Sequence, residues 1–113
     1  MNRVKRGTTS VKRRKNVLKQ TKGFRHGRSS KEAQATEAIL HAGTYAFAHR
    51  KDKKSDARRL WQTRISAALK PHGFSYSKFI GALKKKEIEL DRKILSDLAI
   101  KSPMTFEKIV KSV

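Results

Sequence analysis

Residues 29–69 read SSKEAQATEAILHAGTYAFAHRKDKKSDARRLWQTRISAAL, and no proline interrupts the chain between them and Pro71. Ser29 or Ser30 can cap the start of a helix. Apolar residues then recur at steps of three and four, as one face of an α-helix requires; they are Ala33, Ala38, Ile39, Ala42, Ala46, Leu60, Trp61, Ile65, Ala68 and Leu69. We therefore predict one long helix over residues 31–70, in which Gly43 permits a bend.

The middle of this predicted helix has no apolar face at all. Residues 49–56 read HRKDKKSD and contain no side chain that a protein core would bury. A helix without a core beneath it is stabilised weakly, because most helical stability in proteins comes from packing an amphipathic face. This part of the helix is therefore predicted either to fray in solvent or to lie against a polyanion.

The C-terminal half carries the candidate core. Pro71 and Gly73 end the long helix, and Ser75, Asp91 and Ser102 can each cap one short amphipathic helix. The three predicted apolar faces consist of Tyr76, Phe79, Ile80 and Leu83, then Ile94, Leu95, Leu98 and Ala99, then Phe106, Ile109, Val110 and Val113. Packed against Leu60, Ile65 and Leu69, with Trp61 at the edge, they predict a small all-α domain over residues 60–113.

The N-terminal segment is of the opposite character. The first 31 residues contain twelve Lys or Arg and no Asp or Glu. We predict an extended tail over residues 2–8, a short helix from a Ser10 cap to about Lys22 with Gly23 as its stop, and a turn over residues 24–28. Because few apolar residues are present, residues 1–30 are predicted to be a basic extension that orders along nucleic acid.

The strong positive charge of this chain restricts the kinds of partner that it can bind. The net charge of +20 needs a counter-charge, and the commonest biological polyanion is nucleic acid. A solvated, self-repelling tail is the alternative. No apolar stretch approaches the roughly 20 residues that span a bilayer, and no large apolar face favours a membrane-surface helix. An organellar transit peptide is disfavoured because the basic character is rich in Lys and continues past residue 31.

Nothing in the sequence favours catalysis, a metal or a cofactor. The chain has no cysteine, and its four histidines (His26, His41, His49 and His72) lack a partner at metal-ligand spacing. The acidic residues Glu87, Glu89 and Asp91 fall in one predicted connection and helix cap. We therefore expect no enzyme activity, no cofactor and no small-molecule substrate.

Six segments in order resemble the bacterial large-subunit ribosomal protein twenty family: RVKRG at 3–7, KGF at 22–24 with RS at 28–29, AGTYA at 42–46, LWQTRISAA at 60–68, GFSYSKFIGALKK at 73–85 and IELDRKILSDLA at 88–99. The resemblance implies direct binding to large-subunit ribosomal RNA, a role in early subunit assembly and contacts with neighbouring ribosomal proteins. It implies a cytoplasmic ribosome of bacterial type, or an organellar one, and leaves open control of translation of the protein's own message.

The predicted RNA-binding residues are mainly cationic: Arg3, Lys5, Arg6, Lys12, Arg13, Arg14, Lys15, Lys19, Lys22, Arg25, His26, Arg28, Lys31, Arg50, Lys51, Lys53, Lys54, Arg58, Arg59, Arg64, Lys84, Lys85 and Lys86. The family pattern has an unbroken basic series near residue 55, which Asp52, Asp56 and Ala57 interrupt here. Tyr45 and Phe47 lie on different helix faces, so at least one should face solvent or a partner. The competing hypothesis is a basic architectural protein that binds duplex DNA.

Overall fold

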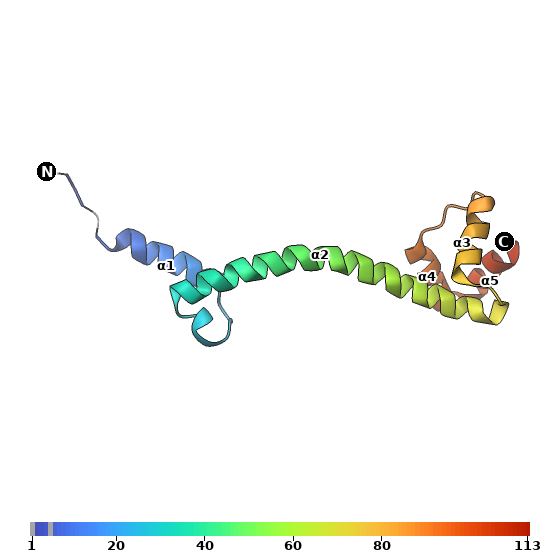
Figure 1. The fold of residues 1–113 in the computed structure, drawn as a ribbon, viewed down its shortest axis with the longest axis horizontal. Coiled ribbons are helices and arrows are strands. Elements are labelled where there is room, and N and C mark those ends of the chain that lie inside the picture. Colours follow the sequence, from blue (N-terminus) through green and yellow to red (C-terminus); the bar gives the residue numbers. More distant parts are fainter. Residues whose placement is uncertain (1, 5) are drawn as a thin grey trace. The chain divides into compact units, whose positions relative to one another are not determined.

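The computed structural model describes residues 2–4 and 6–113, and these residues form helices without any strand. The elements are α1 (Thr8–Gln20), η1 (His26–Arg28), α2 (Glu32–Leu69), η2 (Lys70–His72), α3 (Tyr76–Lys85), α4 (Arg92–Lys101) and α5 (Pro103–Ser112) (Figure 1). The all-α prediction is confirmed. The chain divides into two compact units, residues 1–50 and 51–113, and the boundary falls within α2.

Helix α1 begins earlier than predicted. Its N-cap is Gly7, whose φ of 71° lies in the left-handed region that glycine adopts without a steric penalty. The predicted cap at Ser10 is wrong: the Ser10 hydroxyl lies inside the helix and donates to the Gly7 carbonyl at 2.9 Å. The helix ends at Gln20, and Gly23 in the following turn has a φ of 86°.

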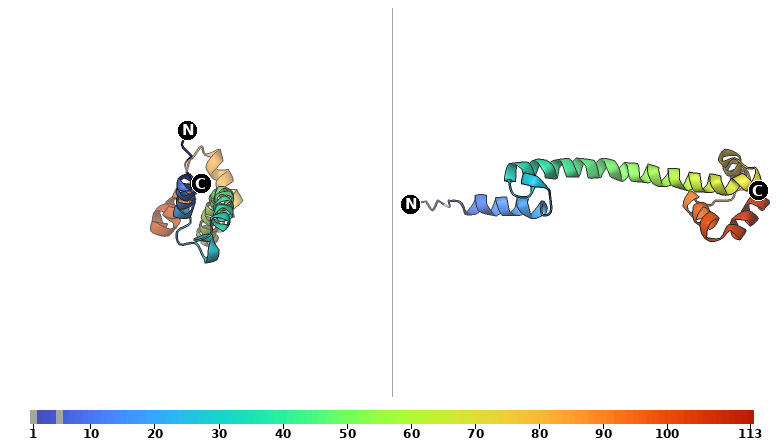
Figure 2. Two further views of the ribbon diagram at one scale, coloured as in Figure 1. Left: turned by 90° about the vertical axis from the view of Figure 1, so that its left-hand side faces the viewer. Right: turned by 90° about the horizontal axis from the view of Figure 1, so that it is seen from below.

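Two side chains of α1 tie it to the start of α2. Arg14 Nη2 donates to the Ser30 carbonyl at 2.8 Å, and Arg13 Nε lies 3.8 Å from Glu32 Oε1. Figure 2 shows α1 beside the first turns of α2. Among the described residues of this unit, Thr21 and Ala35 are the buried ones, so apolar packing contributes little here.

The long helix starts at Glu32, one to two residues later than a Ser29 or Ser30 cap would place it. The backbone amides of Ser30 and Lys31 instead donate to the Gly27 carbonyl, at 3.3 and 2.8 Å, and close the turn that contains η1. The predicted end of the helix is confirmed. Helix α2 stops at Leu69, and η2 leads to Gly73, which has a φ of 69°.

The last turns of α2 bury part of the predicted apolar face. Ile65 and Leu69 are fully buried, whereas Leu60 is 48 % exposed, so its predicted place in the core is wrong. Leu60 precedes Ile65 by five positions, which turns it about 140° away from Ile65 around a helix of 3.6 residues per turn. Trp61 is half-buried and does not belong to the core cluster.

The core of residues 51–113 joins α2 to the three short helices (Figure 1). Its buried members are Ile65, Leu69, Phe79, Leu83, Leu95, Phe106 and Val110. The rings of Phe79 and Phe106 pack at an angle of 50° with their centroids 5.9 Å apart. The predicted faces of α3 and α5 are confirmed, and on α4 Ile94 is the exception, because it is 47 % exposed.

Caps and turns set the directions of the short helices. Ser75 Oγ accepts from the Lys78 amide at 3.4 Å, which confirms the predicted cap. Asp91 and Ser102 stand at the predicted N-cap positions, but their side chains make no capping hydrogen bond. After α3, Glu87 adopts a φ of 55°, and the Ile88 amide donates to the Leu83 carbonyl at 3.0 Å, as in a Schellman motif.

The conformation of Glu87 yields a stability prediction. A left-handed backbone strains a side chain with a Cβ, so Glu87→Gly should raise the free energy of unfolding of the C-terminal core by about 1 kcal/mol. Urea unfolding followed by far-UV circular dichroism measures this change. The matched control is Glu89→Gly, which removes the same charge where φ is not positive and should not stabilise. Destabilisation by Glu87→Gly would contradict the strain argument.

The core cluster yields a second prediction. Phe79→Ala removes a fully buried ring, and such truncations cost about 3–5 kcal/mol. A core this small holds little more stability than that, so the cooperative thermal transition should disappear. Leu60→Ala is the control: at 48 % exposure the leucine should change the transition by about 0.5 kcal/mol or less. Equal losses in the two variants would show that the core is misassigned.

Candidate nucleic-acid interface

The predicted contact residues are nearly all exposed. Of those that the structure describes, Arg64 is half-buried and the others present their charges to solvent. Lys5 was also predicted, but it lies outside the described residues. Exposure makes these cations accessible to a polyanion, whereas their contact with RNA stays a prediction.

The basic run on α1 separates into two kinds of side chain. Lys12, Lys15 and Lys19 follow one another at i, i+3 and i+7, so they share one helix face and are all exposed. Arg13 and Arg14 lie on other faces and are the residues that tie α1 to Glu32 and Ser30. The lysine face is therefore the part of α1 that is presented outward.

The turn between α1 and α2 carries five of the predicted contacts, namely Lys22, Arg25, His26, Arg28 and Lys31. His26 has a φ of 57°, in the left-handed region that residues with a Cβ rarely adopt. A Cβ at Gly27 would collide with the side-chain amide of Gln34 on α2. The turn thus packs closely on the first turns of α2.

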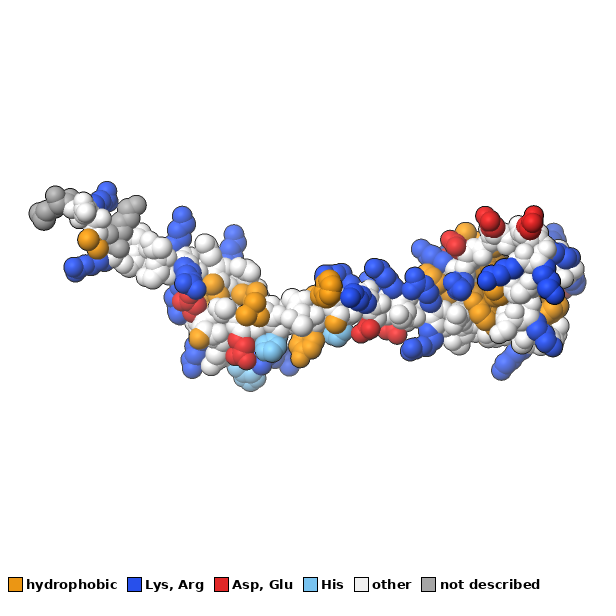
Figure 3. Space-filling view, turned by 45° about the horizontal axis from the view of Figure 1, so that its top comes forward, with side chains coloured by type: hydrophobic (Ala, Val, Ile, Leu, Met, Phe, Trp, Pro, Cys, Tyr) orange, Lys and Arg blue, Asp and Glu red, His pale blue; other side chains and the backbone are white. Residues whose placement is uncertain are grey.

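Three of the basic residues in the middle of α2 lie on a different face from its two aspartates. Lys51, Lys54 and Arg58 recur at i, i+3 and i+7; we call these three residues the basic stripe. By helical spacing Asp52 and Asp56 lie on roughly the opposite face. Figure 3 shows Asp/Glu side chains along one edge of this helix and several Lys/Arg side chains along the other. By this spacing neither aspartate lies between two members of the basic stripe, and Asp56 Oδ1 pairs with Arg59 Nη1 at 3.6 Å.

The basic stripe shares its face with the C-terminal core. Ile65 follows Arg58 by seven positions, two helical turns, and Leu69 follows one turn later. Both are buried against α3, α4 and α5. The short helices therefore pack on the same side of α2 that the basic stripe occupies, so one ligand can contact both.

The C-terminal cations differ in how far they are already neutralised. Lys84, Lys85 and Lys86 are exposed at the end of α3, and Lys86 Nζ donates to the Ser112 carbonyl. Lys111 Nζ lies 2.6 Å from Glu107 Oε1, and its hydrogen bond lowers the pKa of that carboxyl. Lys101 pairs with Asp97 at 3.6 Å. A lysine that is paired with a carboxylate contributes less net charge to a ligand than a lysine without such a partner.

Sequence reasoning missed one cationic groove. Arg59 and Lys70 line a hollow of about 420 Å³ whose wall is completed by Tyr76 from α3. The Tyr76 hydroxyl also accepts from Arg92 Nε at 3.0 Å. The helical spacing of Arg59 and Lys70 was visible in the sequence, but the approach of Tyr76 depends on the tertiary fold.

Aromatic rings line a further face of α2. The centroids of His41 and Tyr45 are 6.3 Å apart and those of Tyr45 and His49 are 5.9 Å apart, with interplanar angles of 22° and 17°. We call these three residues the ring ladder. Tyr45 and Phe47 are 58 % and 59 % exposed, which confirms that at least one aromatic of this pair faces outward.

Two searches of the described residues bear on other classes of site. Within residues 2–4 and 6–113, no three His, Asp or Glu side chains gather as metal ligands would. In the same residues, no helix combines the length and apolarity that crossing a membrane demands. What the structure presents is an all-α protein whose exposed surface is strongly cationic, the class that binds polyanions.

Comparison with known proteins makes the assignment specific. The sequence model of the family described as ribosomal protein L20 matches residues 3–109. The large ribosomal subunit protein bL20 of Geobacter metallireducens is 52 % identical over 109 residues, which cover 96 % of this chain and 93 % of the relative. That of Mycoplasmopsis synoviae is 50 % identical over 113 residues, covering 100 % and 97 %. The chain belongs to the ribosomal protein L20 family, whose members are structural and not enzymes.

The lysine face of α1 generates a binding prediction. Each phosphate contact that is lost should reduce the slope of log K against log salt by about 0.7–0.9. Replacing Lys12, Lys15 and Lys19 by Ala should therefore reduce the slope for ribosomal RNA by roughly two to three units. Filter binding at several salt concentrations measures it. An unchanged slope would mean that this face of α1 does not meet RNA.

Proposed function

We propose that this protein binds large-subunit ribosomal RNA directly and supports early assembly of the large ribosomal subunit in the cytoplasm. The observation that carries the proposal is the surplus of exposed cations on helices that have almost no core beneath them. Residues 1–50 hold thirteen Lys or Arg and two acidic residues, and in the described part of this unit Ala35 is the buried apolar side chain. Such a segment is stabilised by a polyanion rather than by its own packing.

The two units would contribute differently to binding. Residues 51–113 hold the whole core cluster, so their exposed cations have fixed relative positions before RNA arrives. RNA is recognised largely by shape, and a shaped junction is matched by groups in fixed relation to one another. We infer that selection of the ribosomal site resides in this unit, through the basic stripe and the cations of α3.

The N-terminal unit would add affinity and reach. Its helix α1 is tied to α2 by one hydrogen bond and one exposed ion pair, and such pairs contribute about 0–1 kcal/mol. A loosely held, highly charged segment can follow phosphates between RNA helices and become ordered there. In this proposal residues 1–59 bind many RNAs with little preference.

Assembly follows from the same physics. A polycation that neutralises phosphates from several RNA segments lowers the repulsion between them, which lets the segments approach. Neighbouring large-subunit ribosomal proteins would then bind to the complex of this protein with the compacted RNA. Control of translation through a messenger RNA that resembles the ribosomal site would use the same surface.

A binding comparison tests the proposal against the DNA-binding alternative. The full-length protein is titrated at physiological salt with a large-subunit ribosomal RNA transcript, with bulk transfer RNA and with duplex DNA. We expect tightest binding to the ribosomal RNA. Equal or tighter binding to duplex DNA would overturn the proposal in favour of an architectural DNA-binding protein.

Matched charge variants sharpen this test. Lys54→Ala with Arg58→Ala removes two charges of the basic stripe and should reduce the salt slope by about 1.4–1.8 units. Lys101→Ala with Lys111→Ala removes two charges that Asp97 and Glu107 already pair, and should change it by less than half as much. If both double variants reduce the slope equally, binding depends on net charge and not on the basic stripe.

A further inference from the structure

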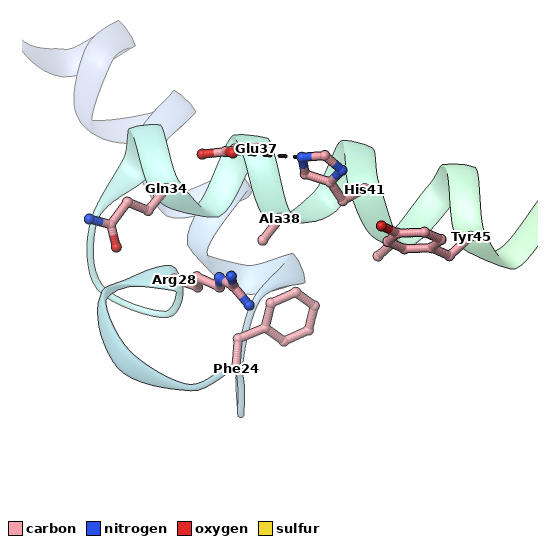
Figure 4. Close-up of a pocket in the computed structure, with 8 residues that line it drawn as sticks. Phe24, Arg28, Gln34, Glu37, Ala38, His41 and Tyr45 are labelled. Atoms are coloured by element: carbon pink, nitrogen blue, oxygen red, sulfur yellow. Dashed lines mark ion pairs between the residues drawn. The ribbon is translucent and has the colours of Figure 1, made fainter.

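A pocket within the first unit is not explained by phosphate binding alone. It has a volume of about 650 Å³ and lies between the turn that follows α1 and the first half of α2. Phe24 and Arg28 line it from the turn, and Gln34, Glu37, His41 and Tyr45 line it from α2. Figure 4 shows the side chains of Phe24 and Arg28 directed toward the α2 side of the pocket.

The turn that forms one wall is held in place by local geometry. Thr21 is fully buried at its start, and Thr21 Oγ1 donates to the Leu18 carbonyl at 3.3 Å. Gly23 takes a left-handed φ of 86°, and the Phe24 amide donates to the Thr21 carbonyl at 3.1 Å. These contacts define the path of the backbone that leads into Phe24.

The opposite wall presents an exposed aromatic ring. Tyr45 is flanked by His41 and His49, which lie nearly parallel to it with centroids about 6 Å away. The three rings lie along one face of α2, and 58 % of Tyr45 is exposed. An exposed ring that lies among other rings offers a planar ligand an aromatic surface to pack against.

Charge indicates what the planar ligand belongs to. Arg28 lies in the pocket wall, and Lys22, Arg25 and Lys31 are exposed on the same turn. A cationic rim around aromatic rings matches single-stranded nucleic acid, because bases stack on rings while phosphates meet guanidinium and ammonium groups. Gln34 and the Glu37 carboxylate, 3.6 Å from His41 Nε2, add hydrogen-bonding groups for the edge of a base.

We propose that this pocket takes one unpaired base of ribosomal RNA, stacked on Tyr45 or Phe24, with Arg28 contacting an adjacent phosphate. The inference rests on the proposed RNA-binding function and adds to it a base-stacking site, which tolerates any base and leaves selection of the ribosomal site with residues 51–113. It separates two kinds of contact in the molecule. The lysine face of α1 and the basic stripe on α2 bind the RNA backbone, while the pocket binds a base that is not paired.

Stacking and charge have different signatures in a salt titration. Loss of a stacked base weakens binding by about 5- to 150-fold at any one salt concentration, but it releases no counterions and leaves the salt slope unchanged. We therefore expect at least one of Tyr45→Leu and Phe24→Leu, in the full-length protein with the ribosomal RNA transcript, to lose affinity without a change in slope. Tyr45→Phe keeps a ring and should retain most of the affinity.

Phe47→Leu supplies the matched control. Phe47 is as exposed as Tyr45 and lies on the same helix, but it is not part of the pocket lining. This variant should change the affinity by less than about twofold, since it removes a ring from another face. Loss of affinity in Phe47→Leu equal to that in Tyr45→Leu would overturn the pocket as the stacking site.

Ultraviolet crosslinking of the wild-type complex gives a readout that does not depend on how well a variant folds. Mass spectrometry should place the crosslinked nucleotide on a peptide that contains Phe24 or Tyr45. RNA crosslinks elsewhere and none in these peptides would overturn the inference, as would unchanged affinity in both leucine variants. If the wild-type protein does not prefer the ribosomal RNA at all, the proposed function itself fails.

Discussion

The last two turns of α2 bury Ile65 and Leu69 among Phe79, Leu95 and Phe106, and the fold of residues 51–113 depends on this packing. Without it, α3, α4 and α5 would each be a helix of ten residues, shorter than an isolated helix needs to be stable in water. The same packing fixes which side of α2 faces the cluster. Because Arg58 stands two turns before Ile65, the core also determines the side on which the basic stripe is presented.

In residues 1–50, by contrast, charge repulsion opposes folding. The first unit has thirteen cationic and two acidic side chains, so bringing α1 close to α2 opposes charge repulsion. One hydrogen bond from Arg14 and one ion pair from Arg13 are the described side-chain interactions that offset it. Function and local stability are therefore in conflict in this unit, and the exposed lysine face that favours RNA binding weakens the free fold.

Much of the architecture could be predicted from sequence because it depends on local signals. The break at Pro71 and Gly73, the Ser75 cap and the apolar faces of α3 and α5 are patterns of a few residues each. The first residues of α1 and α2 were harder to predict. At Gly7 a left-handed glycine replaced the expected serine cap, and after Gly27 a turn used the amides of Ser30 and Lys31. Predicting that Leu60 is exposed would have required knowing which residues of α2 face the core.

Part of the candidate site could likewise be predicted from local sequence patterns, and part depends on the tertiary fold. The cationic residues were visible as a run of charge, and the helical spacing of Lys51, Lys54 and Arg58 already separates them from Asp52 and Asp56. The spacing of His41, Tyr45 and His49 also carried a signal that charge arguments overlooked. The pocket could not be predicted, since Phe24 approaches α2 only through a turn whose path depends on Gly23 and on the burial of Thr21.

The position of the core near the C-terminus has a consequence for biosynthesis. A chain is made from its N-terminus at about 5–20 residues per second, so synthesis of residues 51–113 takes about 3–13 seconds after the cationic first unit has been made. During that interval Phe106 and Val110 have not yet been added, and the core cannot close. The nascent polycation is then attached to an RNA-rich particle, and timely folding of the last three helices limits how long it is exposed there without a folded neighbour.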